Sequence, residues 1–173
     1  MIATSPTYCP DCGGELGTVE FEDRDRDYCS SCDQVWWRQS VPTTSVTVRD
    51  DDSVLLIQRS AGRDAGRWDL PAGHPEYDEP AREAAARELR EETGLVADPG
   101  DLTLVGTVLT EGPRANYRSI NYRIDRAATD GEVTAGSDAA DARFVRVEVI
   151  RTGDVDVRKL GRLRLRNADI LDE

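Results

Sequence analysis

The 173-residue sequence predicts an α/β fold, a mixed sheet with flanking helices, preceded by a small cysteine-rich segment. Two observations predict the sheet and a helix: residues 46–57 have the pattern of paired strands, and residues 79–93 have helical spacing. The third observation is that all four cysteines lie within the first 32 residues. We therefore expect one domain at residues 1–41 and a second at residues 42–173.

The cysteines form two C-x-x-C pairs, Cys9 with Cys12 and Cys29 with Cys32, separated by 16 residues. This spacing is typical of a zinc ribbon, in which four thiolates close a tetrahedral site. The alternatives are two disulfides or a redox C-x-x-C, but disulfides are rare in cytoplasmic proteins, and no strand-helix unit surrounds either pair. Because four cysteines leave no open coordination position, we expect the zinc to be structural.

Two tryptophans and a proline mark the end of this segment. Trp36 and Trp37 could form ribbon core, pack between domains or stack on a base, and we favour core. Pro42 and the polar run at 43–45 indicate a junction near residue 41.

The expected elements of the second domain follow in order. Strands at 46–48 and 54–57 form a hairpin around a turn at 50–53, and a glycine-rich loop follows at 61–67. The helix begins with Asp78 as N-cap and ends at Gly94, with Ala81, Ala85 and Leu89 on its buried face. Further elements are strands at 102–110, 119–124 and 143–147, a turn at 130–131, and a stretch at 154–171 that could be strand or helix.

Three glutamates gather on one face of this helix. Glu88 is three and four residues from Glu91 and Glu92, so their like charges repel one another. A hard divalent cation with oxygen ligands would remove that repulsion. The arrangement therefore predicts a magnesium or manganese site.

The segment from Gly73 to Leu95 fills the pattern G-x5-E-x7-R-E-U-x-E-E-x-G-U, where U is a bulky aliphatic residue. In this respect the chain resembles the Nudix hydrolases. The resemblance implies an α/β/α sandwich and an enzyme that cleaves phosphoric anhydride bonds. Its expected substrate is a nucleoside diphosphate linked to another moiety, and its expected cofactor is Mg²⁺ or Mn²⁺.

The resemblance also implies roles for individual residues. Glu88 and Glu92 resemble the principal metal ligands, and Glu91 resembles a third ligand or the group that orients water. The Ala72 carbonyl resembles a backbone ligand. Arg87 and Glu79 resemble an ion pair that fixes the loop against the helix, and we expect both to face the same side because eight residues are slightly more than two helical turns.

The catalytic base is left open by the sequence. His74 is the only histidine, so a carboxylate or the metal must activate the water. The resemblance implies one more acidic residue from a later loop, and the candidates are Asp138 and Asp141. Similar chains tend to have glutamates where this one has Ala139 and Asp141, so the base is not decided.

Substrate contacts are expected from arginines and aromatic residues. Arg59, Arg63 and Arg67 could meet phosphates. Three aromatic residues could stack on a base or pack in the core: Tyr117, Tyr122 and Trp68.

The substrate itself has several candidates. A zinc ribbon before the Nudix segment resembles the NADH pyrophosphatases, but the glutamine-containing motif of that branch is missing, because no glutamine follows Gln58. Pro113 loosely resembles the proline of ADP-ribose pyrophosphatases. We therefore expect ADP-ribose or a nucleotide sugar. The alternatives are NADH/NAD pyrophosphatase or NAD-cap removal, a non-catalytic nucleotide sensor, and a zinc-ribbon adaptor that docks protein or RNA.

The chain is strongly acidic, with a formal charge of −12 and a pI near 4.6. Such a charge argues against non-specific binding to nucleic acids or anionic membranes. It favours a high-salt cytoplasm, where salt screens the self-repulsion, over an ordinary acidic surface. No apolar run approaches a membrane span and no signal peptide is recognisable. We expect a cytoplasmic protein with a nucleotide partner, and a homodimer is an open expectation.

Overall fold

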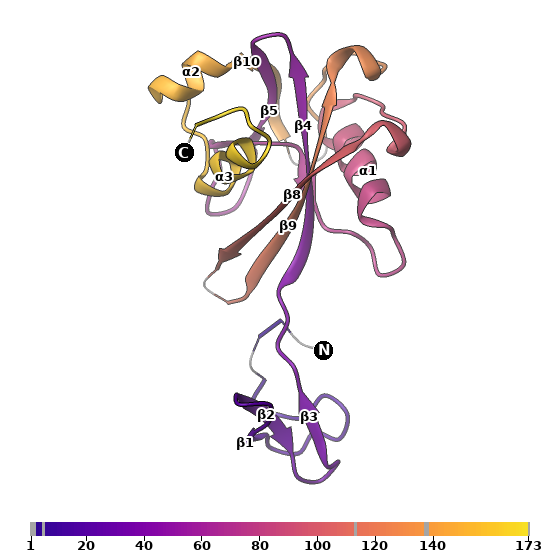
Figure 1. The fold of residues 1–173 in the computed structure, drawn as a ribbon, viewed down its shortest axis with the longest axis vertical. Helices are drawn as coiled ribbons and strands as arrows, with labels where there is room; N and C mark the ends of the chain where they lie inside the picture. Colours follow the sequence, from indigo (N-terminus) through magenta and orange to yellow (C-terminus); the bar gives the residue numbers. More distant parts are fainter. Residues whose placement is uncertain (1–2, 5, 113, 137–138, 173) are drawn as a thin grey trace. The chain divides into compact units, whose positions relative to one another are not determined.

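The structure is a computed structural model that describes residues 3–4, 6–112, 114–136 and 139–172. The chain forms two compact units (Figure 1). The first comprises Met1–Val41 with Thr110–Tyr117, and the second comprises Pro42–Leu109 with Arg118–Glu173. Within the described residues, no helix is long and apolar enough to cross a membrane.

The first unit contains a three-stranded antiparallel sheet. Its strands are β1 (Gly17–Glu20), β2 (Asp25–Cys29) and β3 (Gln34–Trp36), in that order. Trp36 packs with Leu16, Cys9 and Cys29, which confirms its place in a small core. Trp37 is different, because 40% of it is exposed and its ring meets Phe21 edge-on. The expectation of a core position was therefore wrong for Trp37.

The second unit is built on a larger sheet of order β10-β5-β4-β9-β8. Its long strands are β4 (Val41–Asp50), β5 (Ser53–Arg59), β8 (Thr103–Glu111), β9 (Asn116–Asp125) and β10 (Ala139–Arg146). Two short strands extend it: β6 (Trp68–Asp69) pairs with β5, and β7 (Ala72–Gly73) pairs with β4. The predicted hairpin is confirmed, since Arg49 pairs with Val54 around the turn.

Among the described residues of this unit there are also three α-helices and two 3₁₀ helices. They are α1 (Ala81–Thr93), η1 (Pro99–Asp101), η2 (Arg126–Ala128), α2 (Val147–Thr152) and α3 (Lys159–Asn167). Gly94 ends α1 in the left-handed conformation, as predicted, with φ 73°. The predicted N-cap was wrong: Pro80 occupies that position without a side-chain hydrogen bond, and Asp78 lies outside the helix.

The C-terminal stretch is mainly helical, although its sequence alternates like a strand. Gly161, Arg164, Leu165 and Ala168 are all buried, at helical spacing. The sequence looks strand-like because Arg164 stands between Leu163 and Leu165, which gives an alternation of apolar and charged residues. One strand-like contact is present, because Val157 forms a parallel bridge with Trp68.

Strand β5 shows why the sheet needs helices on both faces. Leu55 packs into a core with Leu89 of α1, whereas Val54 and Leu56 pack into a second core with Leu165 of α3. Alternate residues of a strand point to opposite faces, so each core requires its own helix layer. Figure 1 shows α1 on one side of the sheet and α3 on the other. This confirms the α/β/α arrangement.

The polar run at 43–45 directly follows the division between the two units, which falls between Val41 and Pro42, close to the predicted junction. It lies inside β4, and Thr43, Thr44 and Ser45 are all buried. Ser45 donates a hydrogen bond to the Asn121 side chain at 2.9 Å. Such a partner cannot be read from local composition, because it lies 76 positions away.

Candidate functional site

Arg87 organises the acidic end of helix α1. Its Nε and Nη2 donate to the two carboxylate oxygens of Glu79, both at 2.9 Å. Its Nη1 donates to Glu88 at 2.8 Å and to Glu91 at 3.1 Å, and Nη2 also reaches the His74 carbonyl at 3.0 Å. One guanidinium therefore joins the loop before the helix to two of the three clustered glutamates.

Glu79 lies in the loop before α1, so the argument that it shares a helix face with Arg87 was wrong. Glu79 reaches Arg87 because the loop folds back, and its Oε2 also accepts from the Glu76 amide at 3.1 Å. The hydrogen bonds from Arg87 lower the pKa of Glu79 to about 2. The same pairing raises the pKa of Arg87. The pair is thus ionised across the ordinary pH range.

Glu88 lies directly on the backbone of Gly73. A Cβ built on Gly73 would overlap the Glu88 carboxylate, so a side chain at this position would force that carboxylate to move. Strand β7 places Gly73 opposite Thr44 of β4. The glycine therefore lets the Glu88 carboxylate lie against the loop that enters the helix.

Glu92 is anchored to the same loop. It is 3% exposed, and its Oε2 accepts from the Ala72 amide at 2.8 Å. Ala72 pairs with Ser45 in the short β7–β4 contact, which fixes this amide on the sheet. The structure thus brings Ala72, Gly73, Glu88 and Glu92 together.

These carboxylates do not form a tight cluster of ligand atoms. Among the described residues, the four cysteines alone make a group of three or more metal-ligating side chains whose ligand atoms all lie within 4.8 Å. Arg87 already compensates part of the charge of Glu88 and Glu91, which the repulsion argument from sequence left out. The donor set still fits a hard cation, because carboxylate and carbonyl oxygens are the ligands that Mg²⁺ and Mn²⁺ prefer.

Asp141 lies on β10 next to a bulge in its pairing with β5. Its Oδ2 is 3.7 Å from Nη1 of Arg143, whose guanidinium stacks on the Trp68 ring at 4.5 Å. Arg59 pairs with Ala139 one step away, so Arg59 and Asp141 share one end of these two strands. The other candidate base, Asp138, lies outside the described residues, as does Pro113.

The remaining predicted substrate contacts are spread out. The Arg67 guanidinium donates hydrogen bonds to the Asp156 carboxylate, at 3.0 and 3.1 Å, and to the Asp64 carboxylate at 3.3 Å. Tyr117 belongs to the first unit, where its ring lies close to Gly112. Trp68 and Tyr122 are buried in the two cores, so for these two the core alternative is confirmed.

A buried polar network supports the loop, and the sequence prediction missed it. Asp69 precedes Leu70 and Pro71, and its carboxylate meets Arg158 at 2.7 Å and Arg164 at 3.3 Å. Arg164 also donates to Ser119 at 3.0 Å. Helix α3 approaches Asp69 closely, because a Cβ on Gly161 would be 2.7 Å from Asp69 Oδ1. The sequence does carry a signal for this network, because Arg164 stands at a position that helical spacing places on the buried face of α3, beside Gly161 and Leu165.

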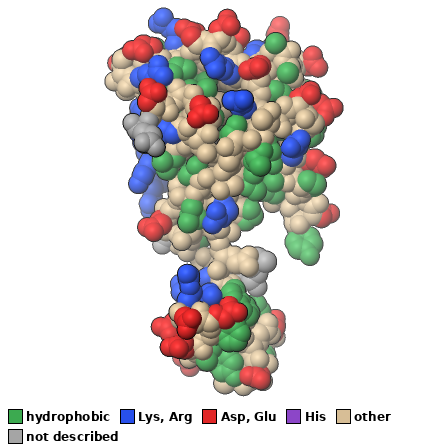
Figure 2. Space-filling view, viewed as in Figure 1, with side chains coloured by type: hydrophobic (Ala, Val, Ile, Leu, Met, Phe, Trp, Pro, Cys, Tyr) green, Lys and Arg blue, Asp and Glu red, His purple; other side chains and the backbone are tan. Residues whose placement is uncertain are grey.

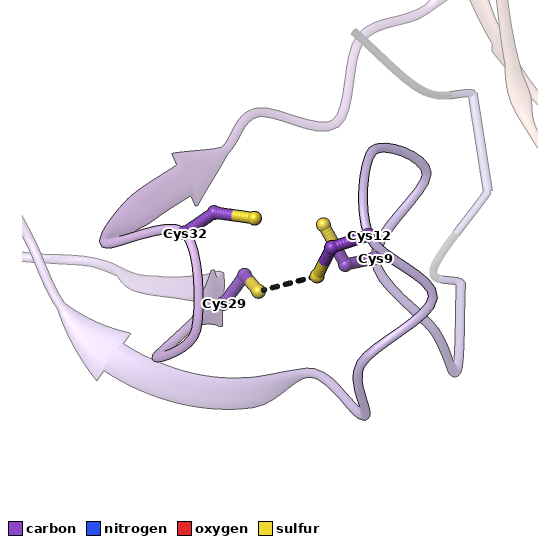
Figure 3. A group of neighbouring side chains, drawn as sticks. All are labelled: Cys9, Cys12, Cys29 and Cys32. Carbon is purple, nitrogen blue, oxygen red and sulfur yellow. Dashed lines mark hydrogen bonds between the residues drawn. The ribbon is translucent and has the colours of Figure 1, made fainter.

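The four cysteine sulfurs face one another in the first unit (Figure 3). The Sγ atoms of Cys12 and Cys29 are 3.6 Å apart, and all four cysteines are free. That separation is too long for a disulfide and is close to the ~3.8 Å that tetrahedral zinc–thiolate bonds require. The Gly14 amide donates to the Cys12 sulfur at 3.4 Å. The geometry is therefore compatible with a zinc ion.

The thiols influence one another's protonation. Hydrogen bonding from the backbone amide of Cys12 lowers the pKa of Cys9 to about 7. Hydrogen bonding to Cys12 raises the pKa of Cys32 to about 12. Thiolates crowded together cannot all ionise without a counter-charge, and a bound dication supplies one.

Similarity to known proteins agrees with this geometry. The chain is 36% identical over 97 residues to an ADP-ribose pyrophosphatase of Methanocaldococcus jannaschii, covering 56% of each chain. It is 36% identical over 91 residues to the NAD-capped RNA hydrolase NudC of Escherichia coli, covering 53% of this chain and 34% of the relative. The chain thus spans about half or less of the length of these curated relatives.

Solved structures show the same fold. A NUDIX hydrolase from Nitrosomonas europaea aligns with a TM-score of 0.70 at 21% identity, covering 95% of this chain and 92% of the other. The NUDIX domain of Shewanella oneidensis NrtR, solved with ADP ribose, aligns with a TM-score of 0.65 at 18% identity, covering 82% and 92%. Residues 39–169 match the NUDIX domain family. The chain therefore belongs to the Nudix family.

Proposed function

We propose that the chain is a metal-dependent Nudix pyrophosphohydrolase, acting on a nucleoside diphosphate linked to another moiety. The observation that carries this proposal is the anchoring of Glu88 and Glu92 against the Ala72–Gly73 backbone, with Arg87 joining Glu79, Glu88 and Glu91. The loop and helix held in this way carry carboxylate and carbonyl oxygens on neighbouring residues. This is the arrangement that a phosphate-bearing substrate and its cation require.

The residues that would hold Mg²⁺ or Mn²⁺ are Glu88, Glu92 and the Ala72 carbonyl, with Glu91 as a third carboxylate. A bound dication supplies neutralisation of phosphate charge and a lower pKa for water. Arg87 and Glu79 hold the loop in register with the helix. Glu91 orients the attacking water or completes the ligand set, and Asp141 is the proposed acid-base residue outside the helix.

We propose ADP-ribose or a nucleotide sugar as the substrate class, supported by the similarity to an ADP-ribose pyrophosphatase. NADH or NAD, free or as an RNA cap, is the second candidate. It is favoured by the four-cysteine cluster together with the similarity to an NAD-capped RNA hydrolase. Arg59 and Arg67 of the second unit remain proposed substrate contacts, and Tyr117, which belongs to the first unit, stays a prediction from the sequence.

The cysteine segment, residues 1–41, is proposed to fold as a structural zinc ribbon. Its apolar core contains three buried side chains, so metal binding would supply much of its stability. The acidic surface is proposed to suit a high-salt cytoplasm, and Figure 2 shows carboxylates distributed over both units.

The test is a hydrolysis panel of ADP-ribose, a nucleotide sugar, NADH, NAD-capped RNA and nucleoside triphosphates, with Mg²⁺ in high potassium chloride. Glu92→Gln is expected to lower turnover by at least about a hundredfold. Glu83→Gln, an exposed change on the same helix, is the matched control. Omitting Mg²⁺ while zinc is retained separates the two metals. Turnover that survives Glu92→Gln or Mg²⁺ omission would refute the metal-dependent mechanism.

A further inference from the structure

A cavity of about 400 Å³ lies beside helix α3 in the second unit. Its lining residues are Arg67, Asp156, Val157, Lys159, Arg162, Leu163 and Arg166. A cavity of this volume is in the range that small-molecule ligands occupy. None of these residues belongs to the glutamate cluster of helix α1, and Arg67 alone among them is also a proposed substrate contact for hydrolysis. The cavity is named here the basic cleft.

The charge of the basic cleft is opposite to that of the chain. The whole chain carries a formal charge of −12, yet four of the seven lining residues are cations and Asp156 is the one carboxylate among them. The Asp156 carboxylate already accepts two hydrogen bonds from Arg67, at 3.0 and 3.1 Å. Lys159, Arg162 and Arg166 are therefore the cations left uncompensated by the lining.

These three cations lie on one face of α3. They are three and four residues apart, at positions 159, 162 and 166, and such spacing places like charges side by side. Within the described part of the chain, none of the three has a carboxylate in ion-pair range, and Arg166 donates to the Asp172 carbonyl at 3.1 Å. By contrast, Arg158 and Arg164 on the same segment are paired with carboxylates.

The cleft also has an apolar part. Val157 is buried, and Leu163 is partly buried between the cations. Cationic side chains beside a small apolar surface suit a ligand with a multiply charged end and a flat organic body. Guanidinium groups bind phosphate oxygens in a bidentate manner, which makes them better phosphate ligands than a single point charge.

We propose that the basic cleft binds the phosphates of a nucleoside di- or triphosphate, either free or at the end of an RNA strand. Arg162 and Arg166 contact the phosphates, Lys159 adds a further ammonium, and Leu163 contacts the nucleoside. This site goes beyond the proposed hydrolytic function and does not depend on it.

The first test is calorimetric titration of the 173-residue chain, purified in the presence of zinc, with ADP, ATP and inorganic diphosphate, without added Mg²⁺ and at moderate salt. The pair R162E/R166E is expected to weaken binding by at least about tenfold, since each charge-assisted hydrogen bond contributes on that order. The matched control is R123E/R146E, which changes the net charge by the same amount at exposed positions on β9 and β10. Circular dichroism confirms that each variant is folded.

The second test uses the chemistry of the single lysine. Lys159 is the only lysine in the chain, so acetylation of a side-chain amine reports on the cleft alone. ADP is expected to slow acetylation of Lys159 several-fold, with the α-amino group of the same molecule as internal reference. Peptide mass spectrometry measures both.

The outcomes separate the two sites. Glu92→Gln is expected to retain binding in the cleft, and R162E/R166E is expected to retain hydrolysis. Loss of binding in Glu92→Gln, equal weakening in both double variants, or an unprotected Lys159 would overturn the proposal, as would the absence of binding to every ligand. A 5′-diphosphate oligoribonucleotide that binds more tightly than ADP identifies an RNA end as the ligand, and the reverse order identifies the free nucleotide.

Discussion

Arg164 and Asp69 form an ion pair inside the second unit: Arg164 Nη1 lies 3.3 Å from Asp69 Oδ1, and the side chains are 3% and 2% exposed. Desolvation lowers the pKa of Arg164, and Asp69 opposes that change. Asp69 also accepts a hydrogen bond from the Leu70 amide. Asp69 lies three residues before Ala72, where the proposed metal site begins. Helix α3 is therefore tied to the strand that leads into the site.

Removing one partner of the Asp69–Arg164 ion pair should lower the free energy of unfolding more than removing both charges. Asp69→Leu leaves a buried guanidinium uncompensated and is expected to lower the free energy of unfolding by about 3–5 kcal/mol. The double variant Asp69→Leu with Arg164→Met is expected to recover part of that loss. Urea unfolding followed by circular dichroism measures both, with exposed Arg90→Ala as control. A double variant no more stable than Asp69→Leu would contradict this account.

Gly73→Ala should damage the proposed site more than the fold. The new methyl group would meet the Glu88 carboxylate, which must move away from the loop. A displacement of about 1 Å at such a site can reduce turnover on the order of a hundredfold. We expect that loss, together with weaker activation by Mg²⁺, in hydrolysis assays. Gly17→Ala is the control, because a Cβ there meets nothing within 4 Å.

Glu79 should make stability depend on pH in the acid range. Its pKa is lowered from 4.5 to about 2 in the folded state. The stabilisation is therefore present above about pH 4.5 and is lost as the pH falls toward 2. We expect a loss of no more than about 3 kcal/mol over that window, smaller where solvent screens the pair. Chemical unfolding at several pH values should show a flatter profile for Glu79→Gln and an unchanged slope for Glu83→Gln.

Cys29→Ser should unfold the first unit selectively. Cys29 is completely buried and packs beside Trp36, so removing its thiolate would remove a proposed zinc ligand from the core. We expect the bound zinc to fall from about one ion per chain toward zero, and Trp36 fluorescence to shift to the red. Elemental analysis and fluorescence measure the two effects. Ser30→Ala, an exposed neighbour, should retain the zinc.

Short-range patterns predicted much of the fold. The β4–β5 hairpin, the end of α1 at Gly94 and the separate cysteine segment follow from turn residues, from the left-handed preference of glycine and from cysteine spacing. The predicted N-cap was wrong, because Pro80 rather than Asp78 occupies that position. The burial of the polar run at 43–45 was not predicted, because Ser45 finds its partner Asn121 far outside the local window. Thr43 to Ser45 look like a linker in composition, yet β4 buries them.

The sequence by itself determined which chemical groups are available: three glutamates at helical spacing, Gly73 before them, and four cysteines in two C-x-x-C motifs. Only the tertiary structure decided how those groups are held. Arg87 shares its charge between loop and helix, Glu92 binds the Ala72 amide, and Arg164 reaches Asp69 across 95 positions. Local spacing specifies which residues share a face, but ion pairs and buried hydrogen bonds depend on which distant segments the packed cores bring together.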